Sequence, residues 1–170
     1  TINTVSELYI VATPIGNLGD MTFRAVEILK SVDVVAAEDT RHTLQLLNHF
    51  EIRKPLVSCR AQNEQFASEK IIKLLDEGQK VAYASDAGTP GISDPGEELV
   101  RQCYEAGIGV TSLPGPAACI TALTLSGLPT RRFAFEAFLP FEKKEKQIIL
   151  DELKHETRTI ILYEAPHRLV

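Results

Sequence analysis

Five short apolar runs alternate with helical segments along most of this chain, and this alternation sets the fold class. The runs read as buried strands at about residues 8–12, 32–36, 56–58, 81–84 and 110–113. Between them, apolar residues recur every three or four positions, which is the spacing of a helix face. Strands connected through helices form parallel sheets, and parallel strands covered on both faces are apolar along their length. We therefore predict an α/β domain in which a five-stranded parallel sheet carries helices on both faces.

The pattern changes after Gly115. The remaining elements are a helix, a half-exposed strand, a charged helix and a final strand, at about residues 116–126, 133–137, 142–153 and 159–163. Two strands and two helices make a poor core and leave sheet edges open. We therefore expect an N-terminal α/β domain at residues 1–115 and, at residues 116–170, the start of a C-terminal α/β domain that is truncated.

Composition narrows the class of protein. The three cysteines form no C-x-x-C pair, which argues against a disulfide framework or a zinc site and favours a reducing compartment. No apolar run approaches the ~18 residues of a membrane span, and residues 1–7 lack a signal-peptide pattern. We therefore expect a cytoplasmic protein without a membrane partner. The formal net charge of −5 counts mildly against a nucleic-acid substrate, but a local basic cleft is compatible with it.

The loops after the strands are the candidates for chemistry, because ligands of parallel α/β sheets bind at the carboxyl ends of strands. After the first strand, Gly16 and Gly19 permit a tight turn close to a ligand. The alternative is an ordinary turn into the next helix with Asp20 as its cap. After the fifth strand, the small residues of segment 114–118 allow a ligand to approach a helix N-terminus.

Two further loops place polar side chains directly after a strand. Residues 38–42 form an unbroken polar run. One interpretation places them at a substrate, and the other makes Asp39 or Thr40 a helix N-cap. After the last strand, His167 and Arg168 belong either to a solvated first helical turn or to a polar cluster at a cleft.

The loop at residues 85–96 is the most informative of the set. It has three glycines and two prolines, and it is longer than the two to six residues that a strand-to-helix connection needs. Asp94 has a structural explanation as the cap of the next helix, with Pro95 in the first turn and Glu97 completing a capping box. Asp86 has no comparable local duty, so it is the better candidate for holding an ammonium or hydroxyl group of a ligand.

Taken together, these loops resemble the tetrapyrrole methylase superfamily and, within it, the ribosomal RNA small-subunit methyltransferase I family. The segments that carry the resemblance are LYIVATPIGNL at 8–18, AAEDTRH at 36–42, SDAGTP at 85–90, LPGP at 113–116 and YEAPHR at 163–168. Five segments in the right order are far more specific than any one of them. One departure is visible, because Arg60-Ala61-Gln62 stands where family members often have a histidine-rich stretch.

The resemblance implies two α/β domains with S-adenosylmethionine in the cleft between them, and a homodimer. It implies 2′-O-methylation of a cytidine ribose in the decoding region of 16S ribosomal RNA, so the small ribosomal subunit is the expected partner. The residues that it implies for cofactor binding are Pro14, Asp86, Ala87, Ala117, Ala118 and Tyr163. No metal is expected, because a sulfonium already activates the methyl group.

The implied reaction requires a base for a ribose hydroxyl and groups that hold RNA. A carboxylate or histidine near the hydroxyl can act as general base, and the candidates are Glu38, Asp39, Glu164 and His167. Arg41 and Arg168 are candidates for binding flanking phosphates, because guanidinium groups match phosphate oxygens. Asn17 is a further candidate for substrate binding.

Three alternatives stay open. The first is a methylase of tetrapyrrole rings (a precorrin-type C-methyltransferase) from the same superfamily. The second is an NAD-type dehydrogenase, suggested by an acid, Glu38, about 20 residues after a glycine turn. The third is a non-catalytic RNA-binding or ribosome-assembly module, which would bind RNA without needing S-adenosylmethionine.

Overall fold

The computed structural model describes residues 8–169. The segment at residues 1–7, where we expect no signal peptide, lies outside the described residues. The chain divides into two compact units, Thr1–Ala117 and Ala118–Val170, and each is described by itself. Within the described part of the chain, no helix is long and apolar enough to cross a membrane.

The first unit is built on a parallel five-stranded sheet with the strand order β3-β2-β4-β1-β5. The strands are β1 (Leu8–Val11), β2 (Val34–Ala37), β3 (Leu56–Ser58), β4 (Val81–Ala84) and β5 (Val110–Leu113). The predicted fold class is confirmed. The predicted start of the second strand at Val32 is wrong, because Val32 ends the preceding helix and donates its N–H to the Ile28 carbonyl. Val32 is fully buried. It is therefore as apolar as the strand that follows it, and the sequence does not mark where the helix ends.

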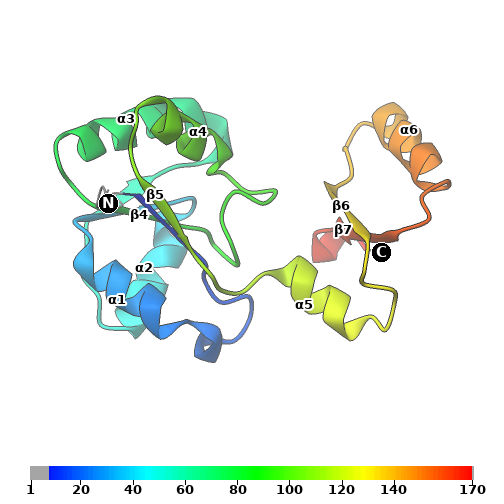
Figure 1. Cartoon of the computed structure of the whole chain (residues 1–170), viewed down its shortest axis with the longest axis horizontal. Helices are drawn as coiled ribbons and strands as arrows, with labels where there is room; N and C mark the ends of the chain where they lie inside the picture. Colours follow the sequence, from blue (N-terminus) through cyan, green and yellow to red (C-terminus); the bar gives the residue numbers. More distant parts are fainter. Residues whose placement is uncertain (1–7, 170) are drawn as a thin grey trace. The chain divides into compact units, whose positions relative to one another are not determined.

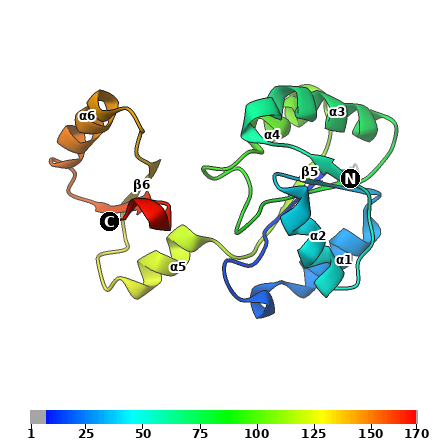
Figure 2. The same cartoon turned by 180° about the vertical axis from the view of Figure 1, so that it is seen from behind.

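Helices cover both faces of this sheet, as Figures 1 and 2 show. They are α1 (Phe23–Ser31), α2 (Thr40–His49), α3 (Glu64–Asp76) and α4 (Glu97–Glu105), with short 3-10 turns η1 (Leu18–Asp20) and η2 (Ala61–Asn63). Leu29 of α1 and Leu47 of α2 pack in one buried cluster. Ile71 of α3 and Leu99 of α4 pack in the other. The sheet therefore separates two cores, and each core buries the apolar stripe of two helices.

Two expected helix caps differ in the structure. The cap of α1 is Thr22, whose hydroxyl accepts the Ala25 N–H at 3.0 Å, so the interpretation of Asp20 as that cap is wrong. The expected capping box around Asp94 is also wrong, because α4 begins at Glu97 after Gly96 and has no side-chain cap of its own. The Glu64 carboxylate of α3 takes that place. Local sequence cannot indicate a contact between such distant segments.

The connections that follow the neighbouring strands β1 and β4 leave toward opposite faces of the sheet. β1 and β4 are neighbours, but the helix after β1 packs on one face of the sheet and α4, after β4, packs on the other. The connections therefore diverge at the carboxyl ends of these strands, and such a point is where open α/β sheets bind their ligands.

The second unit contains a β-α-β arrangement. Its elements are α5 (Ala118–Leu125), β6 (Phe133–Phe138), α6 (Lys143–Leu153), β7 (Thr159–Tyr163) and the turn η3 (Pro166–Arg168). β6 and β7 pair in parallel, with a bulge between Phe135 and Ala137, and Ala137 has a φ of 56°. Such left-handed backbone is costly outside glycine. Among the described residues, its buried apolar side chains are Leu123, Ala134 and Ile161.

Candidate functional site

The loops after β1 and β4 are joined directly to each other. Thr13 and Gly88 exchange backbone hydrogen bonds of 3.0 and 2.9 Å. The buried Thr13 hydroxyl also donates to the Ser85 carbonyl at 3.1 Å, and the Ser85 hydroxyl donates to the Gly88 carbonyl. These bonds satisfy polar groups that burial would otherwise penalise. The turn after β4 is thus held in one conformation against the first loop.

Asp86 connects the β4 loop to the β2 loop. Its Oδ1 accepts the backbone N–H of Asp39 at 3.2 Å, across 47 residues of sequence. The contact is possible because β2 and β4 are neighbours in the sheet. Asp86, expected to bind a cofactor, therefore also orders the polar segment after β2.

Glu38 lies among other carboxylates at the carboxyl end of β2. Partial burial raises the pKa of Glu38 above its ordinary value, and the negative charges of Asp86, Asp94 and Asp39 raise it further. Arg60 opposes the shift. The pKa of Asp94 is also raised, first by burial and then by Asp86. Asp94 belongs to this group of acids, a position that the sequence interpretation missed by assigning it to a cap.

Asp39 has the opposite environment. It is the N-cap of α2, and its carboxylate accepts the N–H groups of Arg41 and His42 at 3.0 and 3.5 Å. These bonds, that from Arg41 first, lower the pKa of Asp39. The interpretation of Asp39 as a helix N-cap is therefore confirmed. The side chain of Arg41 is 88% exposed and lies 3.9 Å from the Asp39 carboxylate, so its guanidinium is accessible to a phosphate.

A pocket of about 200 Å³ opens between the first loop and α2. Its lining residues are Thr13, Pro14, Gly16, Asn17, Leu18, His42, Leu46 and Asp86. Three predicted site residues thus meet there: Pro14, Asn17 and Asp86. Asn17 has a local duty as well, because its side chain accepts the Gly19 N–H at 2.8 Å and caps η1. His42 was not among the candidates, although the polar run to which it belongs was the signal for it.

Small residues surround the ends of the remaining loops in the first unit. Ala87 is exposed, Ala117 is half-buried, and the Thr89 hydroxyl donates to the Pro116 carbonyl at 3.0 Å. A Cβ on Gly115 would lie 2.7 Å from the Cβ of Ala12. The backbones after β1 and β5 therefore approach closely, and side chains there are kept small.

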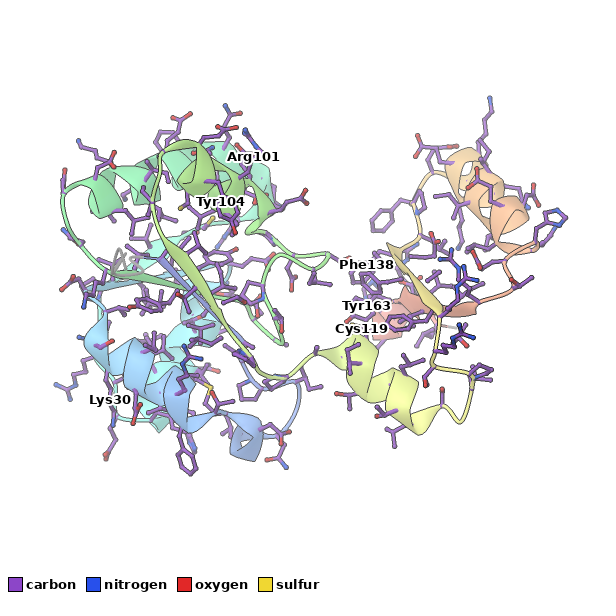
Figure 3. The ribbon with its side chains drawn as sticks, in the orientation of Figure 1. Lys30, Arg101, Tyr104, Cys119, Phe138 and Tyr163 are labelled. Carbon is purple, nitrogen blue, oxygen red and sulfur yellow. The ribbon has the colours of Figure 1, made fainter. Side chains whose placement is uncertain are left out.

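The second unit holds Tyr163 in an aromatic cluster, shown with Phe138 and Cys119 in Figure 3. Its hydroxyl accepts the Cys119 N–H in the first turn of α5 at 2.9 Å. The rings of Phe135 and Phe138 lie edge-on to it, with centroids 5.0 and 5.7 Å away. Ala118, the other cofactor candidate in this unit, is exposed at the start of α5.

The remaining candidates follow β7. Glu164 Oε1 accepts the Ala165 N–H at 2.8 Å and lies 3.5 Å from Nη1 of Arg168. The Arg168 guanidinium also lies 4.2 Å from the centroid of the Phe141 ring. Arg168 is thus held by two neighbours of its own unit, whereas His167 is exposed in η3. Within residues 8–169, no group of three or more His, Cys, Asp or Glu residues is arranged to hold a metal ion.

Comparisons with known proteins give the family. The chain is 57% identical over 163 residues to a ribosomal RNA small subunit methyltransferase I of Synechocystis and 54% identical over 168 residues to that of Escherichia coli O157:H7. These alignments cover 96% and 99% of this chain but 58% and 59% of the relatives. The chain therefore spans less than two thirds of the length of the relatives that it matches.

Solved structures show the same fold. A uroporphyrin-III-C-methyltransferase from Thermus thermophilus has a TM-score of 0.58 at 26% identity, covering 77% of this chain and 58% of that one. A diphthine synthase has a TM-score of 0.70 at 16% identity, covering 94% and 65%. The family described as Tetrapyrrole (Corrin/Porphyrin) Methylases matches residues 7–170. The chain therefore belongs to the tetrapyrrole methylase family, as its loop motifs indicate.

Proposed function

We propose that this chain is part of an S-adenosylmethionine-dependent enzyme that methylates the 2′-hydroxyl of a cytidine ribose in the decoding region of 16S ribosomal RNA. The observation that carries the proposal is the 57% identity to a ribosomal RNA small subunit methyltransferase I over nearly the whole chain. The resemblance also supports a homodimer acting on the small ribosomal subunit in the cytoplasm.

The residues of the first unit fit S-adenosylmethionine as the methyl donor. The Asp86 carboxylate suits the ammonium or ribose hydroxyls of such a ligand, and it lines a pocket together with Pro14. The small side chains of Ala87 and Ala117 leave backbone accessible to a planar base. Ala118 and Tyr163 of the second unit are proposed to complete the binding set.

The chain's own residues would have to align a ribose hydroxyl and accept its proton. S-Adenosylmethionine supplies a methyl group that its sulfonium has already activated. Glu38 suits the role of general base best, because burial and nearby carboxylates raise its pKa toward the working range. Asp39 is less suited, because its carboxylate is bound to the first turn of α2. Arg41, exposed beside Asp39, is proposed to bind a flanking phosphate.

A methyl-transfer assay on small ribosomal subunits tests the proposal. Full-length protein with labelled S-adenosylmethionine should yield 2′-O-methylcytidine in nuclease-digested RNA. The Glu38→Gln protein should bind the donor normally but turn over about 10²-fold more slowly, as expected on loss of a general base. Glu51→Gln, an exposed acid elsewhere in the unit, is the matched control. No methylated nucleoside from wild-type protein and assembled subunits would overturn the proposal.

The same assay separates the second candidate function, a tetrapyrrole C-methyltransferase. The similarity to the uroporphyrin-III-C-methyltransferase structure favours it, but at lower identity than the relatives named for ribosomal RNA. Methyl transfer to a uroporphyrin-type macrocycle, without transfer to RNA, would make this second candidate the better one.

A further inference from the structure

The loop Ser85–Gly96 is held at both ends by contacts from other segments. Its first residues bond to Thr13. At its other end, the Oε1 atom of Glu64 accepts the N–H of Gly96 at 2.8 Å and the N–H of Glu98 at 3.3 Å. Glu64 is the first residue of α3, so this carboxylate comes from a helix more than 30 residues earlier in the sequence.

The loop needs such anchors, because its backbone is unusual. Gly88, Gly91, Ser93 and Gly96 all have positive φ angles. Glycine adopts such angles readily, but at Ser93, with a φ of 55°, left-handed backbone is costly and persists where surrounding contacts over-determine it. The N-terminus of α4 has no side-chain cap from its own segment, and a carboxylate is the group that a helix N-terminus favours. The Glu64 contact thus supplies both a cap for α4 and a fixed end for the loop.

The far end of the loop carries Asp94 toward the candidate site. Asp94 lies two residues before Gly96, and its charge interacts with those of Asp86 and Glu38. The Glu64 carboxylate, and not that of Asp94, accepts the N–H groups at the start of α4. Movement of the Gly96 end would therefore displace Asp94 relative to Asp86.

We propose that Glu64 is a positioning residue for the methyl-donor site, acting by fixing the far end of the loop Ser85–Gly96, which carries Asp86. The inference rests on the proposed function for the identity of the ligand. The anchoring step rests only on the hydrogen bonds of Glu64. The two parts can be measured separately.

Hydrogen exchange tests the anchoring step in full-length protein. In Glu64→Ala, the amides of Gly96 and Glu98 should exchange about tenfold faster, in line with the loss of hydrogen bonds to a charged group. Amides of α1 should be unchanged. Glu69→Ala, an exposed acid on the same helix, is the control. Unchanged exchange at Gly96 and Glu98 overturns the anchoring step, and faster exchange throughout α1 shows general destabilisation instead.

Calorimetric binding of S-adenosylhomocysteine and steady-state kinetics test the positioning step. Glu64→Ala should weaken donor affinity about tenfold and raise the donor KM with kcat within about twofold. Glu64→Gln keeps an acceptor oxygen and should recover part of the affinity. If wild type binds no donor, the proposed function fails and the exchange result still stands. If wild type binds and Glu64→Ala binds equally well despite loosened amides, the positioning role is wrong.

Discussion

The two units of this molecule differ in how completely they bury their own apolar surface. In the first unit, four helices close over both faces of a five-stranded sheet, and strands β2 and β4 are buried along their whole length. In the second unit, every described residue of α6 is at least partly exposed, and the buried apolar side chains among its described residues are Leu123, Ala134 and Ile161. The first unit therefore covers both faces of its own sheet, whereas we expect the second unit to need further contacts to be stable.

The two units also differ in net charge. The segment 1–117 has ten Lys and Arg against sixteen Asp and Glu, whereas the segment 118–170 has eight against seven. The acidic balance of the chain thus belongs entirely to the first unit. The net charge of −5 is therefore a poor argument against an RNA substrate, because it averages two units of different character.

Separating the two units should produce the largest effect. Residues 1–117 alone should unfold cooperatively in urea, because their sheet is covered on both faces. Residues 118–170 alone should show no cooperative transition, because a two-stranded sheet is marginal by itself. Circular dichroism during urea titration measures both. A cooperative transition in the isolated second unit would remove the contrast.

The next largest effect is expected at Gly96, within the first unit. A Cβ there would lie 2.9 Å from Cε1 of the buried Tyr83, at a φ of 134°. Gly96→Ala should therefore lower the free energy of unfolding by about 3 kcal/mol, through strain and overpacking together. Gly78→Ala is the control, since Gly78 also has a positive φ but no neighbour within 4 Å, and it should cost about 1 kcal/mol. Equal losses of stability in the two variants would show that the core around Tyr83 rearranges to accommodate the added Cβ.

A matched pair of tyrosine substitutions compares the units directly. Tyr163→Phe removes the acceptor of the Cys119 N–H and should cost about 1 kcal/mol. The hydroxyl of Tyr83 is buried, and its neighbour is the Cys59 thiol, which is only a weak hydrogen-bonding group. Tyr83→Phe should therefore leave stability unchanged or raise it by up to about 1 kcal/mol. Thermal unfolding of the full-length variants measures both, and a marked loss in Tyr83→Phe would mean that its hydroxyl is satisfied in solution.

The smallest effect is expected at Asp94. Its pKa is raised in the folded state, so its contribution favours folding below its unfolded pKa and is lost as the pH rises through the folded pKa. Asp94→Asn should therefore stabilise the protein near pH 7, by about 0.5 kcal/mol after allowance for solvent screening. The gain should vanish near pH 3.5. Urea midpoints at the two pH values measure it, and a gain that persists in acid contradicts the assigned cause.

Much of the scaffold is predictable because its signals are local. Strands β3, β4 and β5 have the predicted bounds, and Gly78 and Gly107 follow helix ends with positive φ, as is typical of helix-ending glycines. Val32 was misassigned because burial makes a helix end and a strand start equally apolar. Local signals therefore find elements well and their ends less well.

The contacts between loops were not predictable in the same way. The hydrogen bond from the Asp39 N–H to Asp86 depends on β2 lying beside β4. The periodicity of apolar residues predicts strands but not their order in the sheet. The same holds for Glu64 at the start of α4, where a plausible local capping box pointed to Asp94 instead. Asp39 as an N-cap was predictable, because its partners are its immediate neighbours.

Unfolding of full-length protein with and without S-adenosylmethionine tests most directly whether the loops of the first unit bind a methyl donor. At 100 times its dissociation constant, the donor should add about 2.7 kcal/mol to the free energy of unfolding. The Asp86→Asn protein should show a much smaller gain at the same concentration. Stabilisation of the wild type that falls in the variant is the result we predict. No stabilisation of the wild type at millimolar donor would contradict donor binding by these loops and favour a module that binds RNA without catalysis.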